Sequence, residues 1–193
     1  GYAAAEVEAD DADPRLATAL SEVGSAVRAA DWPRVFALID AAFADGLRHP
    51  FFHRLRALRA QQEGRLDEAI ADFEAAIAAS PGDFATLNTL GLCLAQSGRT
   101  VEGLARLDNS IALNPAFAAA HFNRGSALEA LGEAEGARRA YARAVEIEPG
   151  HAQARAALAA IVGQVGEPKR VPYSRGAGPK IGSPKARRLS PSP

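Results

Sequence analysis

Apolar side chains recur every three or four residues in several segments, which is the spacing of one face of an α-helix. Leu87, Leu90 and Leu94 form such a stripe. A less regular version runs from residue 16 to residue 49, where it predicts helices over residues 15–29 and 33–45. We therefore predict an all-α protein.

Residues that break helices interrupt this pattern at a fixed interval. Three prolines recur at one constant spacing, and each follows a glycine at half that spacing: Gly64 and Pro81, Gly98 and Pro115, Gly132 and Pro149. Glycine ends a helix easily because it adopts a left-handed backbone, and proline stops a helix because it lacks an amide hydrogen. The common period of roughly 34 residues is typical of stacked helical hairpins.

Residue size also repeats within the 34-residue unit. With Pro50 as position 1, positions 8, 20 and 27 hold small residues and position 24 holds a large one. The small residues are Ala57, Gly91 and Gly125, then Ala69, Gly103 and Ala137, then Ala76, Ser110 and Ala144; the large ones are Phe73, Leu107 and Tyr141. We expect the small residues to let the two helices of a hairpin cross closely. The large residue then fills the space between hairpins.

This pattern resembles the tetratricopeptide repeat. Two segments match the second-helix motif of that family, Ala69-x-x-x-Phe73-x-x-Ala76 and Ala137-x-x-x-Tyr141-x-x-Ala144, and Leu87-x-x-Leu90-Gly91-x-x-Leu94 matches the first-helix motif. The resemblance implies a right-handed α-solenoid of antiparallel helical hairpins, with three units over residues 50–83, 84–117 and 118–151. Residues 14–49 are then a degenerate N-terminal hairpin, and residues 152–166 form a capping helix whose polar residues face water.

The resemblance also implies that the first helix of each hairpin lines a concave surface that binds a peptide. Twelve residues are our candidates for this contact: Phe51, Arg54, Leu58, Gln62, Asn88, Thr89, Leu92, Gln96, Phe122, Asn123, Ser126 and Glu129. The asparagines and glutamines among them can both donate to and accept from a peptide backbone, and the two phenylalanines can receive apolar side chains. Family members that hold a terminal carboxylate use several lysines and an arginine, whereas Arg54 stands nearly alone here.

Two positions of the unit depart from the family pattern. Position 4 holds His53 and His121, and position 7 holds Arg56 and Arg124, where the family usually has large apolar residues. We interpret the histidines as packing residues rather than ligands. For the arginines we expect the aliphatic stems to pack while the guanidinium groups reach solvent.

No residues in the sequence are arranged as a catalytic, cofactor or metal site. We expect no metal site at the four histidines, and Cys93 lies in an apolar helix where inert packing is expected. The glycine-rich segment 175–183 fails as a phosphate loop because it contains Pro179 and opens no helix. We therefore predict a protein that is not an enzyme.

Charge is concentrated at the two ends of the chain. Five acidic residues lie in the acidic N-terminal segment 1–13, and seven basic residues oppose one acid in the basic tail 167–193, although the net charge is −1. Six prolines lead us to expect an extended or disordered tail. It is a linker, or it lies on a repeat groove of its own or a neighbouring chain and so causes self-association. Nucleic-acid binding is disfavoured because Tyr173 is the tail's lone aromatic residue.

The function we predict is a non-catalytic protein–protein interaction scaffold that recognises a peptide or partner surface. One alternative is an accessory substrate-recognition region of a larger enzyme, because alanine-rich bacterial arrays of this kind often precede sulfotransferase or hydroxylase domains. The other is binding of nucleic acid or of an acidic surface through the basic tail. We expect no membrane insertion, because no apolar run approaches the roughly 20 residues that span a bilayer. No stretch has the order of a signal peptide, and we expect a cytoplasmic location.

Overall fold

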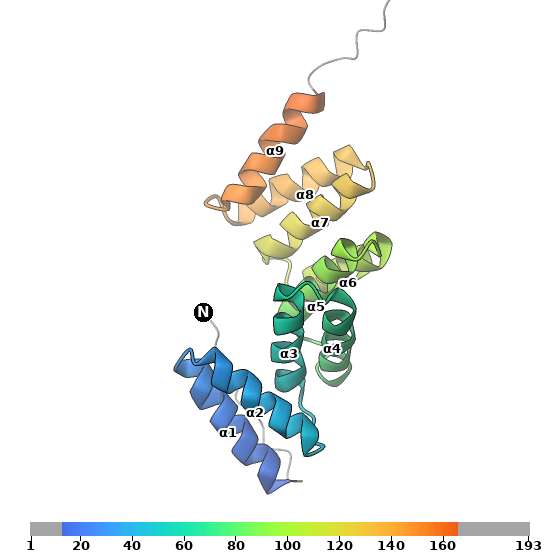
Figure 1. Ribbon diagram of the computed structural model, residues 1–193. Helices are drawn as coiled ribbons and strands as arrows, with labels where there is room; N and C mark the ends of the chain where they lie inside the picture. The colour runs from blue at the N-terminus through green and yellow to red at the C-terminus, as the bar shows by residue number, and fades with distance from the viewer. Residues whose placement is uncertain (1–12, 166–193) are drawn as a thin grey trace, which may run out of the picture.

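A computed structural model describes residues 13–165 of the 193-residue chain. Within this range the chain forms helices and no strands (Figure 1). The helices are α1 (Pro14–Arg28), α2 (Trp32–Ala44), α3 (Pro50–Gln62), α4 (Leu66–Ala79), α5 (Phe84–Gln96), α6 (Thr100–Leu113), α7 (Ala118–Ala130), α8 (Ala134–Ile147) and α9 (Ala152–Val165). The helices predicted over residues 15–29 and 33–45 are α1 and α2, each displaced by one residue.

Successive helices pair into antiparallel hairpins that stack in an arc, and α9 packs on the last of them (Figure 1). The all-α, right-handed solenoid predicted from the sequence is confirmed. The first helices α3, α5 and α7 lie on the side toward which the arc opens, and α4 and α6 lie on the opposite side. The hairpins α3–α4 and α5–α6 therefore each present one helix to each of these two sides.

The periodic glycines and prolines set the helix ends by local backbone geometry. Gly64, Gly98 and Gly132 have φ angles of +74°, +87° and +79° and lie just beyond the first helices. Each periodic proline lies two residues beyond the end of a second helix, as Pro81 does after α4. In the hairpin α1–α2 the corresponding turn holds Ala30, which adopts a φ of +53° without the help of glycine.

The hairpin α5–α6 shows why small residues recur at positions 8 and 20. A Cβ atom on Gly91 would stand 2.7 Å from Cγ of Leu107 and 2.9 Å from the carbonyl oxygen of Gly103. A Cβ atom on Gly103 would in turn stand 2.6 Å from the carbonyl oxygen of Gly91. Real Cβ atoms do not approach other atoms this closely, so the crossing requires glycine on both helices.

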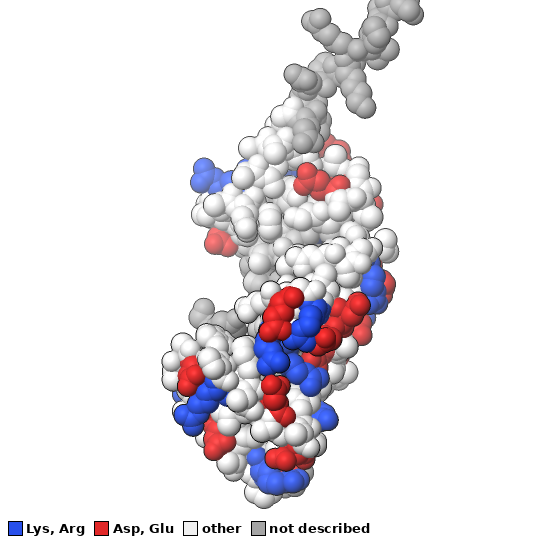
Figure 2. Space-filling view, viewed as in Figure 1, with Lys and Arg blue, Asp and Glu red and all other residues white. Residues whose placement is uncertain are grey.

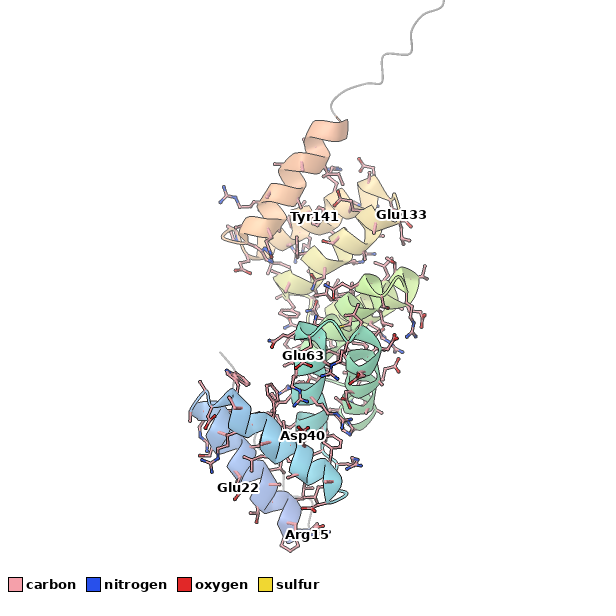
Figure 3. All side chains as sticks on the ribbon, viewed as in Figure 1. Arg15, Glu22, Asp40, Glu63, Glu133 and Tyr141 are labelled. Carbon is pink, nitrogen blue, oxygen red and sulfur yellow. The ribbon has the colours of Figure 1, made fainter. Side chains whose placement is uncertain are left out.

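The large residue at position 24 also packs as expected. Tyr141 on α8 is 1% exposed and belongs to a core cluster with Leu128 of α7 and Ile161 of α9. Figure 3 shows it at the place where these helices meet. The tyrosine therefore joins the last hairpin to α9, as Phe73 joins α4 to Leu90 and other residues of α5.

Candidate peptide-binding face

The twelve candidate residues lie on α3, α5 and α7, the helices on the open side of the arc. We call these twelve residues the first-helix face. The outline of the molecule is hollowed on this side, and in the same view charged side chains gather over α3, α4 and α6 (Figure 2). Most of the twelve are half-buried, and Gln62, Gln96 and Glu129 are exposed. Asn88 is the exception, since only 8% of it is accessible.

Asn88 and Asn123 contact each other rather than standing as separate polar groups. The amide nitrogen Nδ2 of Asn123 donates to Oδ1 of Asn88 at 2.9 Å, which joins α7 to α5. Among the described residues, no buried side-chain polar atom lacks a partner. Nδ2 of Asn88 makes no side-chain hydrogen bond in that part of the chain, so it must reach solvent. The pair therefore keeps one donor on Asn88 and one acceptor on Asn123.

Arg54 is already paired with an acid on the next hairpin. Its Nη1 atom donates to Oδ2 of Asp83 at 3.2 Å, and its guanidinium lies over the Phe51 ring at 5.6 Å. Asp83 also accepts from the backbone nitrogen and the hydroxyl of Thr86, at 3.0 and 2.7 Å, and thereby caps α5. Burial raises the pKa of the Asp83 carboxyl, but its bonds to Thr86 and the charge of Arg54 outweigh this effect and lower it. The charge of Arg54 is thus balanced within the protein.

The other ionisable member of the face, Glu129, is held by a buried tyrosine. The hydroxyl of Tyr141 donates to Oε2 of Glu129 at 2.7 Å and lies 3.3 Å from Oγ of Ser126. Burial raises the pKa of Tyr141 to about 12, so the hydroxyl remains a donor at neutral pH. The Phe122 ring lies beside the same tyrosine, with 5.8 Å between centroids. These contacts fix the end of the face that α7 contributes.

The histidine and arginine of the first repeat form a polar cluster that the sequence did not lead us to expect. Nε and Nη2 of Arg56 each donate to an Asp72 carboxylate oxygen at 2.5 Å, and Nδ1 of His53 lies 2.8 Å from Oδ1. The Arg56 guanidinium also stacks on the Phe43 ring at 3.7 Å. We expected this guanidinium to extend into solvent; instead, a buried acid on α4 and an aromatic ring on α2 hold it.

Similar pairing occurs in the third repeat with different partners. Nε of Arg124 donates to Oδ1 of Asp108 at 2.6 Å, and Nε2 of His121 lies 3.0 Å from the carbonyl oxygen of Pro115. The histidines at position 4 therefore form hydrogen bonds in addition to packing. The sequence could have indicated these contacts, because a histidine and an arginine recur together on one helix face. Such a pair predicts an acidic residue on a neighbouring helix.

The described residues show no sign of a reactive cysteine, a metal site or a membrane-spanning helix. Cys93 is 0% exposed, and burial raises the pKa of its thiol to about 11. Between residues 13 and 165, no group of three or more His, Cys, Asp or Glu side chains is placed to hold a metal ion. Over the same residues, no helix combines the length and the apolar character needed to cross a membrane. The predictions for segment 1–12 and tail 167–193 fall outside the described residues.

Comparison with known proteins identifies the repeat. The geometry defines an α-solenoid of helical hairpins, and two models of the tetratricopeptide repeat match residues 60–110 and 118–151. Residues 60–110 and 118–151 of the chain are therefore tetratricopeptide repeats. No curated protein matches it.

Several solved structures share the fold at low sequence identity. A double mutant of MamA RS-1 is 15% identical with a TM-score of 0.69, and the match covers 80% of this chain and 87% of that one. YrrB, described as a protein with an unusual peptide-binding site, is 18% identical with a TM-score of 0.66 and coverages of 74% and 73%. The first such domain of Spaghetti (RPAP3), bound to the HSP90 peptide SRMEEVD, is 22% identical with a TM-score of 0.59 and coverages of 61% and 94%.

Proposed function

We propose that this protein is a non-catalytic interaction scaffold that binds an extended segment of a partner protein on the first-helix face. The observation that carries the proposal is the Asn88–Asn123 pair, which joins neighbouring first helices and keeps a free donor and a free acceptor. An extended peptide backbone presents the complementary acceptor and donor to such a pair.

The face favours a ligand segment with few charges. Its two ionisable residues, Arg54 and Glu129, are both bonded within the protein. A segment that brought carboxylates here would lose water without gaining a free cation, which is unfavourable. Half-buried Leu58, Leu92 and Phe51 instead offer apolar contacts. The ligand is therefore an extended segment with apolar side chains, held by its backbone at the asparagine pair.

The peptide-bound structure of RPAP3 provides a contrast. Its peptide, SRMEEVD, contains two glutamates and ends in an aspartate. The first-helix face here has one arginine, and that arginine is paired with Asp83. We propose that this protein, like the RPAP3 domain, binds a peptide on its helical repeats, but that it does not select acidic peptides of that kind.

The test is a selection of peptides from a random library on the full chain, followed by calorimetry with the peptides recovered. Two changes should weaken binding by at least about tenfold, or about 1.4 kcal/mol: Asn123→Ala, which removes the backbone contact, and Leu92→Arg, which blocks the apolar surface. The matched controls are Asn109→Ala and Leu113→Arg, both at exposed positions of α6 on the opposite surface. Circular dichroism and thermal unfolding verify that all four variants fold.

Two results contradict the proposal. One is a set of recovered peptides whose binding is unchanged by both substitutions on α5 and α7. The other is a preference for acidic peptides with a free C-terminal carboxylate, which requires cations that the face does not offer. Loss of binding in the α6 controls would place the site on the other surface.

A further inference from the structure

Helix α9 takes the place of a first helix in the repeat, but within the described residues no second helix follows it to cover its outer side. In the complete repeats, position 11 of the first helix is covered: Ala60 and Leu94 are 1% exposed and Leu128 is 5% exposed. The same position of α9 is Val162, which is 51% exposed. Position 8 is buried in each complete repeat, whereas Ala159 of α9 is exposed.

This surface is broad and almost uncharged. It forms an open depression of about 690 Å³, lined by α9 from Ala152 to Val162 and by Val145 of α8. Arg155 is the one charged residue of α9. Figure 2 shows little charge over this helix, in contrast to the ion pairs over α3, α4 and α6. We call this surface the α9 face.

Residues 166–193 lack the sequence pattern of the second helix that covers this position in the complete repeats. Continuing the 34-residue count from Ala152, positions 20, 24 and 27 fall on Val171, Arg175 and Gly178. Position 24 is therefore an arginine, where the complete repeats have phenylalanine, leucine or tyrosine. Prolines at 168, 172, 179 and 184 also interrupt every stretch long enough for a second helix of the length of α4, α6 or α8.

We propose that the α9 face binds the α9 face of a second copy of this chain, with the two helices antiparallel across a two-fold axis. Ala152, Ala156, Ala159 and Gly163 are exposed and spaced by four, three and four residues along one side of α9. Small residues at this spacing let an identical helix approach closely, and Val162 packs into the contact from both sides. Such an isologous contact is the commonest arrangement of homodimers.

Charge is compatible with this arrangement. In an antiparallel pair centred on Ala159, Arg155 of one copy stands opposite Gly163 of the other. The two Arg155 side chains are then eight residues apart along the axis, or about 12 Å at 1.5 Å per residue. This separation exceeds the Debye length of about 8 Å at physiological ionic strength, so their repulsion is largely screened.

The size of the contact predicts a reversible dimer. A helix of 14 residues is about 21 Å long, and two such helices bury less than the roughly 1,200–2,000 Å² of a typical stable interface. We therefore expect monomer at low concentration and dimer at high concentration. The proposal concerns a surface distinct from the first-helix face and does not depend on peptide binding there.

The experiment is sedimentation equilibrium of the full chain from about 5 μM to about 1 mM, compared with two variants. We expect the apparent mass of the unmodified chain to double across this range. Val162→Arg should weaken association at least about tenfold, because it places a charge in the contact. Val101→Arg is the matched control, since Val101 is an exposed valine of α6, 71% accessible, and should associate like the unmodified chain.

A full chain that stays monomeric at the highest concentration overturns the proposal. It is also overturned if Val162→Arg associates as tightly as the control. A third variant, truncated after residue 165, separates the α9 face from the basic tail. Dimerisation that survives truncation but is lost in Val162→Arg supports the α9 face as the interface. Dimerisation that is lost on truncation but survives in Val162→Arg assigns self-association to the tail.

Discussion

Two parts of this solenoid are held together by different interactions, close backbone packing in one and charged contacts in the other. Between α5 and α6, two glycines let the helix backbones approach until a single added Cβ would overlap the opposite carbonyl. Where α2 meets α3, Arg56 of α3 instead bridges the Phe43 ring of one hairpin and the Asp72 carboxylate of the next. A second polar contact lies in this region: Nη1 of Arg59 on α3 donates to Oδ2 of Asp40 on α2 at 3.3 Å, and Figure 3 labels Asp40.

The difference follows from the sequence of each part. The crossing of α5 and α6 has the small residues of the repeat, so its stability depends on shape. The junction near α2 lies at the edge of the degenerate hairpin, where charged and aromatic residues replace the repeat pattern. We therefore expect the crossing to be sensitive to side-chain volume and the junction to be sensitive to charge and pH.

The largest effect should come from filling the crossing. Gly91→Ala places a methyl group about 2.7–2.9 Å from Leu107 and from the backbone of Gly103, and we expect it to lower the free energy of unfolding by about 3 kcal/mol. Urea unfolding followed by circular dichroism measures this. The control is Gly24→Ala in α1, whose added Cβ meets an ordinary contact at 3.5 Å, and which should gain up to about 1 kcal/mol from helix propensity. Equal effects at both sites would show that close approach is not the reason for glycine.

The next effect should come from the charge at the junction. Asp72→Asn removes the carboxylate that accepts from Arg56 and His53, and we expect a loss of about 2 kcal/mol because the Asp72 side chain is only 8% exposed. Asp108→Asn is the control, since it removes a similar pair with Arg124 whose side chains are 55% and 34% exposed. Its loss should stay below about 1 kcal/mol. Chemical unfolding of both variants gives the comparison, and a larger loss for Asp108→Asn would contradict it.

The junction should also give the protein a particular acid sensitivity. Burial raises the pKa of Asp72, but the hydrogen bonds from Arg56 and His53 outweigh it and lower the pKa below its ordinary value of 3.8. The pair therefore stabilises the fold above pH 3.8, and this contribution disappears as pH falls from there toward the folded-state pKa. Unfolding measured between pH 6 and pH 2.5 should show a shallower decline for Asp72→Asn than for the unmodified chain. Parallel curves would mean that other carboxyls dominate.

A smaller and opposite effect should follow from restoring the repeat in the degenerate hairpin. Ala30 has a φ of +53° at the turn where the complete repeats use glycine. A left-handed backbone costs a residue with a Cβ about 1–2 kcal/mol, so Ala30→Gly should raise the free energy of unfolding by about 1 kcal/mol. Ala29→Gly, at a φ of −80°, should instead be neutral or destabilising. Thermal unfolding of the two variants tests this prediction. A higher free energy of unfolding for both variants would rule out backbone strain as the cause.

The smallest effect concerns the start of α3. Nδ1 of His49 accepts from the backbone nitrogen of Phe51 at 3.2 Å, and burial lowers the pKa of His49 from 6.5. As pH falls below 6.5, the unfolded chain binds this proton first, so stability declines toward the folded-state pKa. His49→Asn keeps a cap acceptor without titrating and should remove a decline of a few tenths of a kcal/mol between pH 7 and pH 5.5. An unchanged pH profile would show that His49 does not titrate on unfolding.

Features that depend on local backbone geometry could be predicted from the sequence. The helix ends beside Gly64, Gly98 and Gly132 follow from the turn conformation that glycine allows. The small residues at the crossing of α5 and α6 could be recognised because the same sizes recur once in every repeat unit. The assignment of candidate face residues to α3, α5 and α7 also followed from this register, and their role in binding stays a prediction.

The polar partners could not be predicted, because they are far apart in the chain. Asn88 and Asn123 are 35 residues apart, and Arg56 and Asp72 are 16 residues apart on different helices. Whether such groups meet depends on how the helices are rotated about their axes, both within a hairpin and between hairpins, and a one-dimensional pattern does not contain this rotation. The same rotation decides that Arg54 is balanced by Asp83, whereas Val162 is exposed because no second helix of the described chain covers it. The sequence thus determined where helices begin, end and cross, since those depend on backbone conformation and residue size, and the tertiary stacking alone decided which charges and amides are left for a partner.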